Sequence, residues 1–439
     1  MLERLFGLQA HGTSVRTEAL AGATTFMTMA YIVLVNPLIL SEAGMPVAGV
    51  AAATCLAAGF GSILMGLVAN YPLALAPGMG LNAYFTFTVV KGMGVPWQTA
   101  LGCVLISGLV FLVLTLAGVR KLIVEAVPRP LFAAIAAGIG LFIAFIGLKG
   151  AGLVVANPAT TVALGDLKAP TTLLSLAGLL VTGVLMARRI RAAVLIGILV
   201  VTALAFLLHV TPFKPAPYDL SGLSATAFKA DLGGVLGLGK GGLSVAILEI
   251  VFVFLFVDFF DNLGTLVAVT KRAGLQAPDG TIPRLNRILL ADSVATIAGA
   301  AAGTSTVVSY IESATGVAAG GRTGLTAVVV GLLFLITLFL APYVQLIPAA
   351  ATAPALILVG GMMMAPLAET DWADPEISIP AFLTLTVIPL TFSIANGLAF
   401  GIVSHAGLKL LRHGPRRADL ALYLLAALFI ARFAWTAGA

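Results

Sequence analysis

Acidic side chains inside long apolar stretches are the first residues in this sequence that could do chemistry. Five of them occur: Glu249, Asp258, Asp261, Asp292 and Glu312. An ionisable group is costly in lipid, so each should face a protein interior, a water-filled cavity or a partner. No Lys or Arg lies deep within an apolar stretch to neutralise them. A carboxyl group removed from water favours its protonated form, which makes these acids candidates for carrying a proton.

Two of the acids lie close together in the segment FLFVDFFDNLGT. Asp258 and Asp261 are three residues apart, so they share one face of the predicted helix. We predict a substrate-site role for Asp258. Asp261 is predicted either to join the same site or to bond backbone groups freed where Gly264 interrupts the helix. Glu249 and Asp292 are predicted to be an interfacial acid and a structural acid.

Glu312 lies in the polar segment GTSTVVSYIESATG, which would make a poor lipid-facing helix. The β-branched run Thr306-Val307-Val308 indicates extended backbone, and such backbone is tolerated at membrane depth only where it is buried or lines a cavity. We therefore predict that Glu312 binds substrate. The alternative is that its side chain caps the half-helix that follows.

Asn82 lies in PGMGLNAYF, where Pro77, Gly78 and Gly80 break any helix just before it. Its amide offers donors and an acceptor, so it can bind a ligand edge or the freed backbone. Gly80 can let a ligand approach the backbone, or can serve close packing. Both are predicted members of a substrate site.

These residues need a membrane-spanning scaffold. The 439-residue chain is 60% hydrophobic and only 10% charged, against about 25% charged in ordinary soluble domains. We count fifteen apolar stretches, among them 20–41, 47–69, 243–268 and 286–302. Membrane lipid is therefore an expected partner. The net charge of +6 reflects Lys and Arg in cytoplasmic loops rather than nucleic-acid binding.

Positive charge also predicts orientation. Arg4 and Arg16 precede the first stretch, and the Arg188-Arg189 and Lys271-Arg272 pairs fall in loops on the same side by alternation. Because Lys and Arg accumulate on the cytoplasmic side, the N-terminus should be cytoplasmic.

The chain divides into two similar halves. An offset of 230 residues takes Asn82 to Glu312, Thr28 to Asp258 and Tyr31 to Asp261. Seven stretches in the first half would place the second half upside down in the membrane. Paired, interrupted segments in inverted halves indicate the substrate site of a transporter. Thr28 is therefore added to the candidate site.

Other classes fit less well. An intramembrane aspartyl protease needs Tyr-Asp and Gly-x-Gly-Asp motifs, and a zinc protease needs His-Glu-x-x-His. The sequence has none of these motifs, and its histidines show no metal-ligand spacing. We expect no enzyme activity, no metal and no cofactor apart from a coupling proton. A passive channel remains an alternative to a carrier.

Four motifs together carry a family resemblance: TTFMTMAYIVLVNP, APGMGLNAYF, FVDFFDNLGT and GTSTVVSYIESATGVAAGGRTG. They resemble the AzgA-like adenine/guanine/hypoxanthine permeases, nucleobase–cation symporters related to the nucleobase–ascorbate transporters. The resemblance implies an all-α polytopic protein with 14 transmembrane segments in two inverted repeats of seven. Segments three and ten would each hold a short strand and a half-helix.

The resemblance also implies a division into core and gate domains. The expected parts are a cytoplasmic N-terminal segment, the first halves of core and gate, and their second halves: 1–19, 20–117, 118–242, 243–341 and 342–439. The substrate would bind between core and gate, and the core would move against the gate as an elevator.

By resemblance, the matching site positions are Gly80 and Asn82 in segment three, Asp258 in segment eight and Glu312 in segment ten. Asp258, Glu312 and Asp261 are the candidates for proton coupling. Aromatic rings available to stack on a base are those of Phe259, Phe26 and Tyr84. The implied function is proton-coupled import of purine nucleobases across a bacterial inner membrane. Alternatives are a carrier of xanthine, urate or uracil, or an anion carrier of the same fold. A homodimer is left open.

Overall fold

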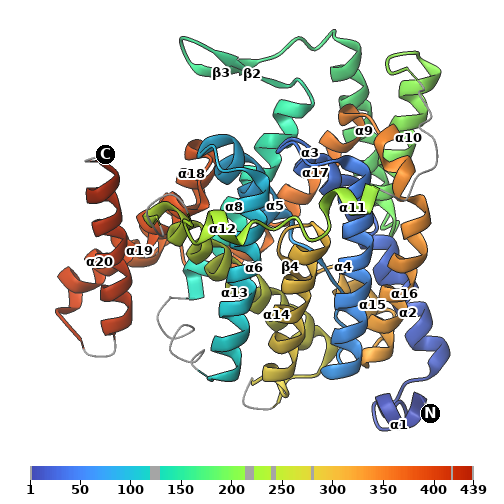
Figure 1. Ribbon diagram of the computed structural model, residues 1–439, viewed down its shortest axis with the longest axis horizontal. Helices are drawn as coiled ribbons and strands as arrows, with labels where there is room; N and C mark the ends of the chain where they lie inside the picture. Colours follow the sequence, from blue (N-terminus) through green and yellow to red (C-terminus); the bar gives the residue numbers. More distant parts are fainter. Residues whose placement is uncertain are drawn as a thin grey trace. The chain divides into compact units, whose positions relative to one another are not determined.

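The computed structural model describes residues 2–118, 129–212, 222–238, 244–277, 281–416 and 419–437. These residues are mostly helical, with two short two-stranded sheets (Figure 1). Within these ranges, nine helices are long and apolar enough to cross a membrane. The predicted helical polytopic membrane fold is confirmed, and the count of 14 segments stays a prediction.

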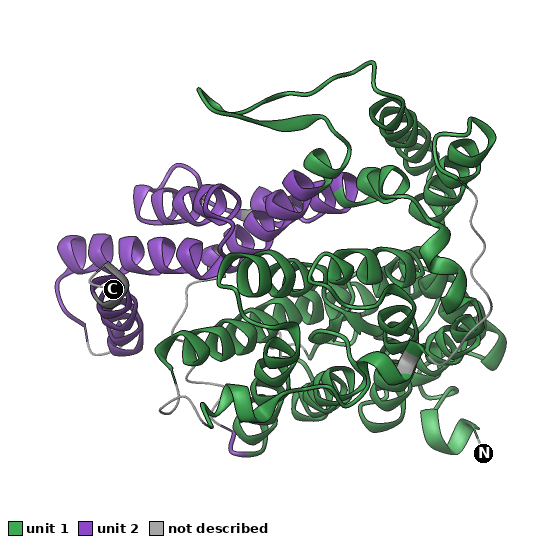
Figure 2. Cartoon of the chain, turned by 45° about the horizontal axis from the view of Figure 1, so that its top comes forward, with its two compact units in different colours: residues 1–116, 147–356 green, residues 117–146, 357–439 purple. Residues whose placement is uncertain are grey.

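The described residues form two compact units, 1–116 with 147–356 and 117–146 with 357–439 (Figure 2). All predicted site residues belong to the first unit. Its helices are α1 (Leu2–Phe6), α2 (Val15–Met29), α3 (Ile32–Ser41), α4 (Val47–Val68), α5 (Met79–Ala83), the π-helix η1 (Tyr84–Gly92), α6 (Trp97–Leu116), α9 (Pro170–Ala187), α10 (Ala193–Leu207), α11 (Gly222–Thr226), α12 (Leu232–Val235), α13 (Val245–Ala273), α14 (Leu285–Ala302), α15 (Ser313–Ala318), α16 (Gly324–Thr337) and the 3₁₀ helix η2 (Leu338–Leu346).

Two short strands lie at the centre of this unit. β1 (Leu75–Pro77) pairs antiparallel with β4 (Val307–Ser309), and Ala76 lies opposite Val308. The short helix α5 follows β1, and the short helix α15 follows β4. The predicted strand and half-helix in each interrupted segment are therefore present, at places where proline, glycine or β-branched residues disfavour helix. The second sheet is a hairpin of β2 (Val154–Asn157) and β3 (Thr161–Leu164).

Further bonds extend this crossing beyond the strands. The Gly78 backbone N–H donates to the Thr306 carbonyl over 2.9 Å, and the Tyr310 N–H donates to the Ala74 carbonyl over 2.9 Å. The Tyr310 hydroxyl donates to the Pro77 carbonyl over 2.5 Å. Backbone groups that leave helical geometry at membrane depth are thus satisfied inside the protein, as a low-dielectric environment requires.

Helices α4 and α16 are held in close contact by glycines. A Cβ added to Gly331 would lie 2.6 Å from the Gly59 carbonyl oxygen, and a Cβ added to Gly66 would lie closer still to the Gly324 carbonyl oxygen. Small residues at such positions let helix backbones approach, which is how membrane helices gain packing energy. This pair supports the strand crossing, because β1 packs on α4.

Two helices differ from the expectations. The first apolar stretch begins at Val15 and is divided at Ala30–Tyr31 into α2 and α3, rather than running unbroken over 20–41. Conversely, α13 continues through Gly264 to Ala273, so this glycine does not interrupt the helix. A single glycine weakens a helix by only about 1 kcal/mol, which packing overrides.

The second unit holds parts of α8 (Arg129–Gly150) and α17 (Ala349–Met362), followed by η3 (Ala365–Glu369), α18 (Pro375–Thr391), α19 (Ile394–His413) and α20 (Leu420–Ala437). Helices α18 and α19 are separate and pack on each other, with Gly397 facing the Thr384 carbonyl.

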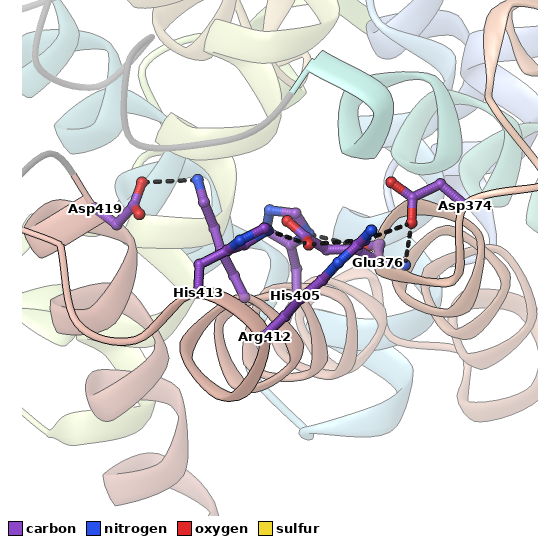
Figure 3. A network of polar contacts seen from close by, with 7 residues as sticks. Asp374, Glu376, His405, Arg412, His413 and Asp419 are labelled. Atoms are coloured by element: carbon purple, nitrogen blue, oxygen red, sulfur yellow. Dashed lines mark hydrogen bonds and ion pairs between the residues drawn. The ribbon is translucent and has the colours of Figure 1, made fainter.

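A polar network joins the start of α18 to the end of α19 (Figure 3). Arg412 contacts Asp374 at 3.0 Å and Glu376 at 3.3 Å, and His413 Nε2 lies 2.9 Å from Glu376. The backbone N–H of Glu376 lowers the pKa of the Asp374 carboxyl group, which caps α18. This network therefore holds the first turn of α18 against the last turn of α19.

Candidate functional site

Glu312 immediately precedes α15, at the point where the chain leaves β4. Its side chain makes no capping bond to the helix. Instead, Oε1 accepts a hydrogen bond of 2.8 Å from the Tyr31 hydroxyl at the α2–α3 junction. Glu312 is half-buried, whereas Tyr31 is only 1% exposed. A carboxylate has further lone pairs beyond the one that Tyr31 uses, so Glu312 retains acceptor capacity for a ligand.

Thr28 makes a second contact between the same two segments. Its hydroxyl donates to the Thr25 carbonyl over 2.7 Å, and its oxygen lies 3.1 Å from the Thr315 hydroxyl oxygen. The structure therefore places Thr28 beside α15, one helical turn from Tyr31. Its described contacts join helices, and they leave its predicted substrate role a prediction.

Asp258 lies deeper than Glu312, between α13, α14 and β4. It is 1% exposed. Its Oδ2 accepts a long bond of 3.5 Å from the Thr296 hydroxyl, while Oδ1 has no hydrogen-bond partner among the described residues. The Thr296 hydroxyl has a single hydrogen, and its oxygen also lies 2.8 Å from the Val307 carbonyl oxygen, so that hydrogen is shared between two acceptors. Asp258 is thus connected to the strand crossing through a single hydroxyl.

Asp261 lies on α13, which packs against α15. It is half-buried, and its carboxyl group is within electrostatic range of those of Glu312 and Asp258. The described ion pairs of the protein involve none of these three acids. The structure therefore brings Asp261 of segment eight close to Glu312 of segment ten. The spacing of these residues in the sequence does not predict this approach.

Asn82 lies in α5 and is fully buried. Its Oδ1 accepts a hydrogen bond from the Ser305 hydroxyl, from the segment just before β4. Its Nδ2 has no partner among the described residues. Leaving a buried amide donor unpaired costs about 1–3 kcal/mol. Asn82 therefore combines a structural bond with a donor that a ligand or a water can use.

Gly80 and Phe259 are both buried in the first unit. Gly80 lies in α5, two residues before Asn82. The Phe259 ring packs edge-on against Phe111, with ring centroids 5.8 Å apart, and against Phe260 at 5.2 Å. Phe259 thus belongs to an aromatic cluster, so its predicted stacking on a ligand stays a prediction.

Two buried polar residues were missed by sequence reasoning. Asn36 in α3 donates to Thr54 of α4 over 2.8 Å and to Thr304 over 2.9 Å, which ties α3 and α4 to the segment before β4. The signal was available, since Asn36 interrupts an apolar run in TTFMTMAYIVLVNP. A buried amide in such a run needs partners.

Glu18 is the second missed residue. Its carboxylate is fully buried and accepts from the Arg322 backbone N–H at 2.9 Å and from the Thr326 hydroxyl at 2.5 Å. The Thr323 N–H also points to it, at 3.3 Å. Glu18 thus neutralises the positive end of α16. Glu18 lies just before the first apolar stretch of the sequence, so the sequence gives no sign that this acid is buried.

The site as a whole offers carboxylate and amide groups at half-buried and buried positions on interrupted segments. Acceptors on Asp261 and Glu312 can take N–H donors from a neutral ligand, and the Asn82 amide can donate to a ligand acceptor. Within the part of the chain that the structure describes, no group of three or more His, Cys, Asp and Glu side chains could hold a metal ion.

Comparisons with known proteins agree with this arrangement. Residues 16–400 match the model of a family described as the permease family. The adenine permease AdeP of Escherichia coli is 45% identical over 98% of this chain and 95% of its own length. The guanine/hypoxanthine permease PbuG of Bacillus subtilis is 43% identical over 98% of this chain and 99% of its own length.

Solved structures show the same fold at low sequence identity. The transmembrane domain of the cyanobacterial bicarbonate transporter BicA superposes with a TM-score of 0.64 at 17% identity, covering 89% of this chain and 97% of that domain. Murine Slc26a9, an anion transporter in the inward-facing state, gives 0.62 at 12% identity, covering 90% of this chain and 69% of that one. These matches confirm the predicted family resemblance: the chain belongs to the permease family and is a multi-pass membrane transporter, not an enzyme.

Proposed function

We propose that this permease imports purine nucleobases together with protons. The observation that carries the proposal is the approach of Glu312 and Asp261 to each other at the interrupted segment after β4. Relatives covering nearly the whole chain are named adenine and guanine/hypoxanthine permeases, which supports the same class of substrate.

Purine chemistry fits these groups. A purine base is neutral and flat, and it presents ring N–H donors and ring-nitrogen acceptors along its edges. Ionised carboxylates can accept from the N–H groups, and the Asn82 amide nitrogen, which has no partner among the described residues, can donate to a purine acceptor. Glu312 is the principal contact in this proposal, since it is half-buried and held from one side by Tyr31.

A carrier of small anions is the competing function, because the superposed structures are of bicarbonate and anion transporters. At 12–17% identity, that likeness concerns the fold alone. Asp261 lies within electrostatic range of both Asp258 and Glu312, and none of these acids has a described ion pair to Lys or Arg, so ionised acids here would repel an anion. A neutral base that brings N–H donors meets no such penalty.

Proton coupling and the elevator movement complete the proposal. Asp258 carries the proton, because its buried Oδ1 lacks a hydrogen-bond partner among the described residues. The core segments, 20–117 and 243–341, move against the gate segments in a bacterial inner membrane with the N-terminus in the cytoplasm. The loop arginines of the sequence support that orientation.

Competition of uptake tests the substrate class. Cells that lack their own purine uptake would express the full chain and receive labelled hypoxanthine, adenine or guanine. We expect saturable uptake that unlabelled purine bases suppress and nucleosides barely affect, since a ribose occupies one of the ring N–H positions from which the acids would accept. Uptake of uracil alone, with none of the three purines, would show the assignment to be wrong.

A further inference from the structure

Tyr31 is a buried residue whose role the substrate site does not by itself explain. Its hydroxyl lies 2.8 Å from Glu312 Oε1, across 281 residues of sequence. The side chain is 1% exposed, and it begins α3 without capping that helix. A buried tyrosine hydroxyl needs a hydrogen-bond partner, so the choice of partner is informative.

Other buried tyrosines of the same unit bond differently. Tyr71, also 1% exposed, donates to the Pro283 backbone carbonyl over 2.8 Å, and Tyr310 donates to the Pro77 carbonyl. A backbone carbonyl is sufficient where a hydroxyl only joins two segments. Tyr31 instead donates to the carboxyl group of an acid, and bonds to a charged acceptor are roughly twice as strong as neutral ones.

The surrounding contacts fix the direction of that bond. Thr28, one turn before Tyr31, contacts Thr315, one turn after Glu312. Two contacts at matching spacing set the register of α2 against α15. The hydrogen bond from Tyr31 to Oε1 therefore restricts rotation of the Glu312 carboxyl group. Its remaining lone pairs can accept a ligand donor only from a limited range of directions.

We infer that Tyr31 is a positioning residue that holds the Glu312 carboxylate at the angle needed to accept purine N–H groups, and thereby sets which purines bind. The inference rests on the proposed function. A carboxylate with one oxygen pinned discriminates between purines whose N–H groups lie at different places on the ring edge. A freely rotating carboxylate accepts from all of them more weakly.

The test is Tyr31→Phe in the purified full chain, with Tyr71→Phe as a matched control. Both variants remove one hydroxyl from a tyrosine that is 1% exposed and whose bond is 2.8 Å long. Binding of labelled adenine, guanine and hypoxanthine would be measured, with the melting temperature of each unliganded variant. We expect Tyr31→Phe to weaken binding of the best purine about 10- to 100-fold, the effect of losing a hydrogen bond to a charged group.

The ranking of the three purines should also change in Tyr31→Phe and stay unchanged in Tyr71→Phe. A further variant, Glu312→Asp, withdraws the carboxylate from the hydroxyl by one methylene. In that background, Tyr31→Phe should have less than about a twofold further effect, because residues acting through one another are not additive.

Three outcomes would overturn the inference. Tyr31→Phe could bind with wild-type affinity and ranking. It could lower the melting temperature and the affinity while keeping the ranking, which is the result of a structural role alone. Its effect could also be undiminished in Glu312→Asp. These results would leave the proposed function standing, provided that the wild-type chain binds purines. Absence of purine binding by the wild type would instead refute the proposed function and this inference with it.

Discussion

Glu312 and Asp258 are both acids at membrane depth, but their surroundings differ. Glu312 is half-buried and accepts from the Tyr31 hydroxyl. Asp258 is 1% exposed, and among the described residues its carboxyl group has one hydrogen-bond partner, Thr296 at 3.5 Å. A half-buried carboxylate with a fixed donor is suited to contact a ligand. A deeply buried one without a cationic partner is suited to exchange a proton, since its charged form gains little from its surroundings.

This contrast predicts different results for two isosteric variants. Glu312→Gln should lower purine affinity about 10- to 100-fold, because it replaces a charged acceptor that a purine N–H would use. Asp258→Asn should keep binding and exchange of purine but lose concentrative uptake and its pH dependence. Both should insert normally, since neutralising an acid makes insertion easier.

Equilibrium binding to the purified variants, followed by exchange of labelled base in vesicles, would measure both effects. Thr352→Val, in α17, is a suitable control because its hydroxyl bonds only to a local carbonyl. Wild-type affinity and wild-type pH dependence in both acid variants would place the site elsewhere.

Sequence reasoning found the residues that stand out chemically and missed their partners. Acids and an amide in interrupted apolar segments can be recognised because lipid makes them costly. Nothing in the spacing predicts that Tyr31 bonds Glu312, or that Ser305 bonds Asn82, because those partners come from packing between distant segments. Asn36 could have been recognised as a buried amide, because it interrupts an apolar run. Glu18 could not, because it lies near the polar start of the chain.

At the scale of elements, interruptions were easier to predict than continuity. Pro77, Gly78 and the run from Thr306 to Val308 break helical geometry for local reasons, and the strands β1 and β4 lie there. The break between α2 and α3 has no such local cause in its residues, and α13 runs unbroken through Gly264. Tertiary packing decides these cases, so local propensity fails.

The glycines between α4 and α16 give a prediction at this scale. In Gly331→Ala, the new methyl group would lie 2.6 Å from the Gly59 carbonyl oxygen and 2.6 Å from the Ile63 side chain. Overpacking of this kind costs about 1–3 kcal/mol, so the melting temperature of the purified protein should fall. Purine affinity should fall together with the melting temperature, because α4 packs against β1, which precedes the candidate site residues of α5.

Gly183→Ala is the matched control. Gly183 lies inside α9, and an added Cβ would have no heavy atom within 4 Å. Its melting temperature should stay the same or rise slightly, since alanine favours helix over glycine by about 1 kcal/mol. Equal changes in melting temperature in the two variants would mean that the close contact between α4 and α16 does not contribute to the stability of the fold.

At the scale of the whole molecule, composition predicted a membrane protein and motifs predicted its family, and both are confirmed. Composition works because so few charged residues cannot cover a water-exposed surface. The number of segments is harder to predict. The chain has fifteen apolar stretches, and helices such as α18 and α19 are shorter or contain prolines and glycines, so hydropathy alone does not say which of them cross.

The central claim is that this protein moves purine bases and protons together. Purified full chain in proteoliposomes, with labelled hypoxanthine, adenine or guanine outside, tests it most directly. With a more acidic exterior, we predict accumulation of at least one purine above its external concentration, and collapse of that gradient when a protonophore is added. Equilibration of purines without accumulation, at every pH difference across the membrane and with no response to the protonophore, would contradict proton-coupled transport.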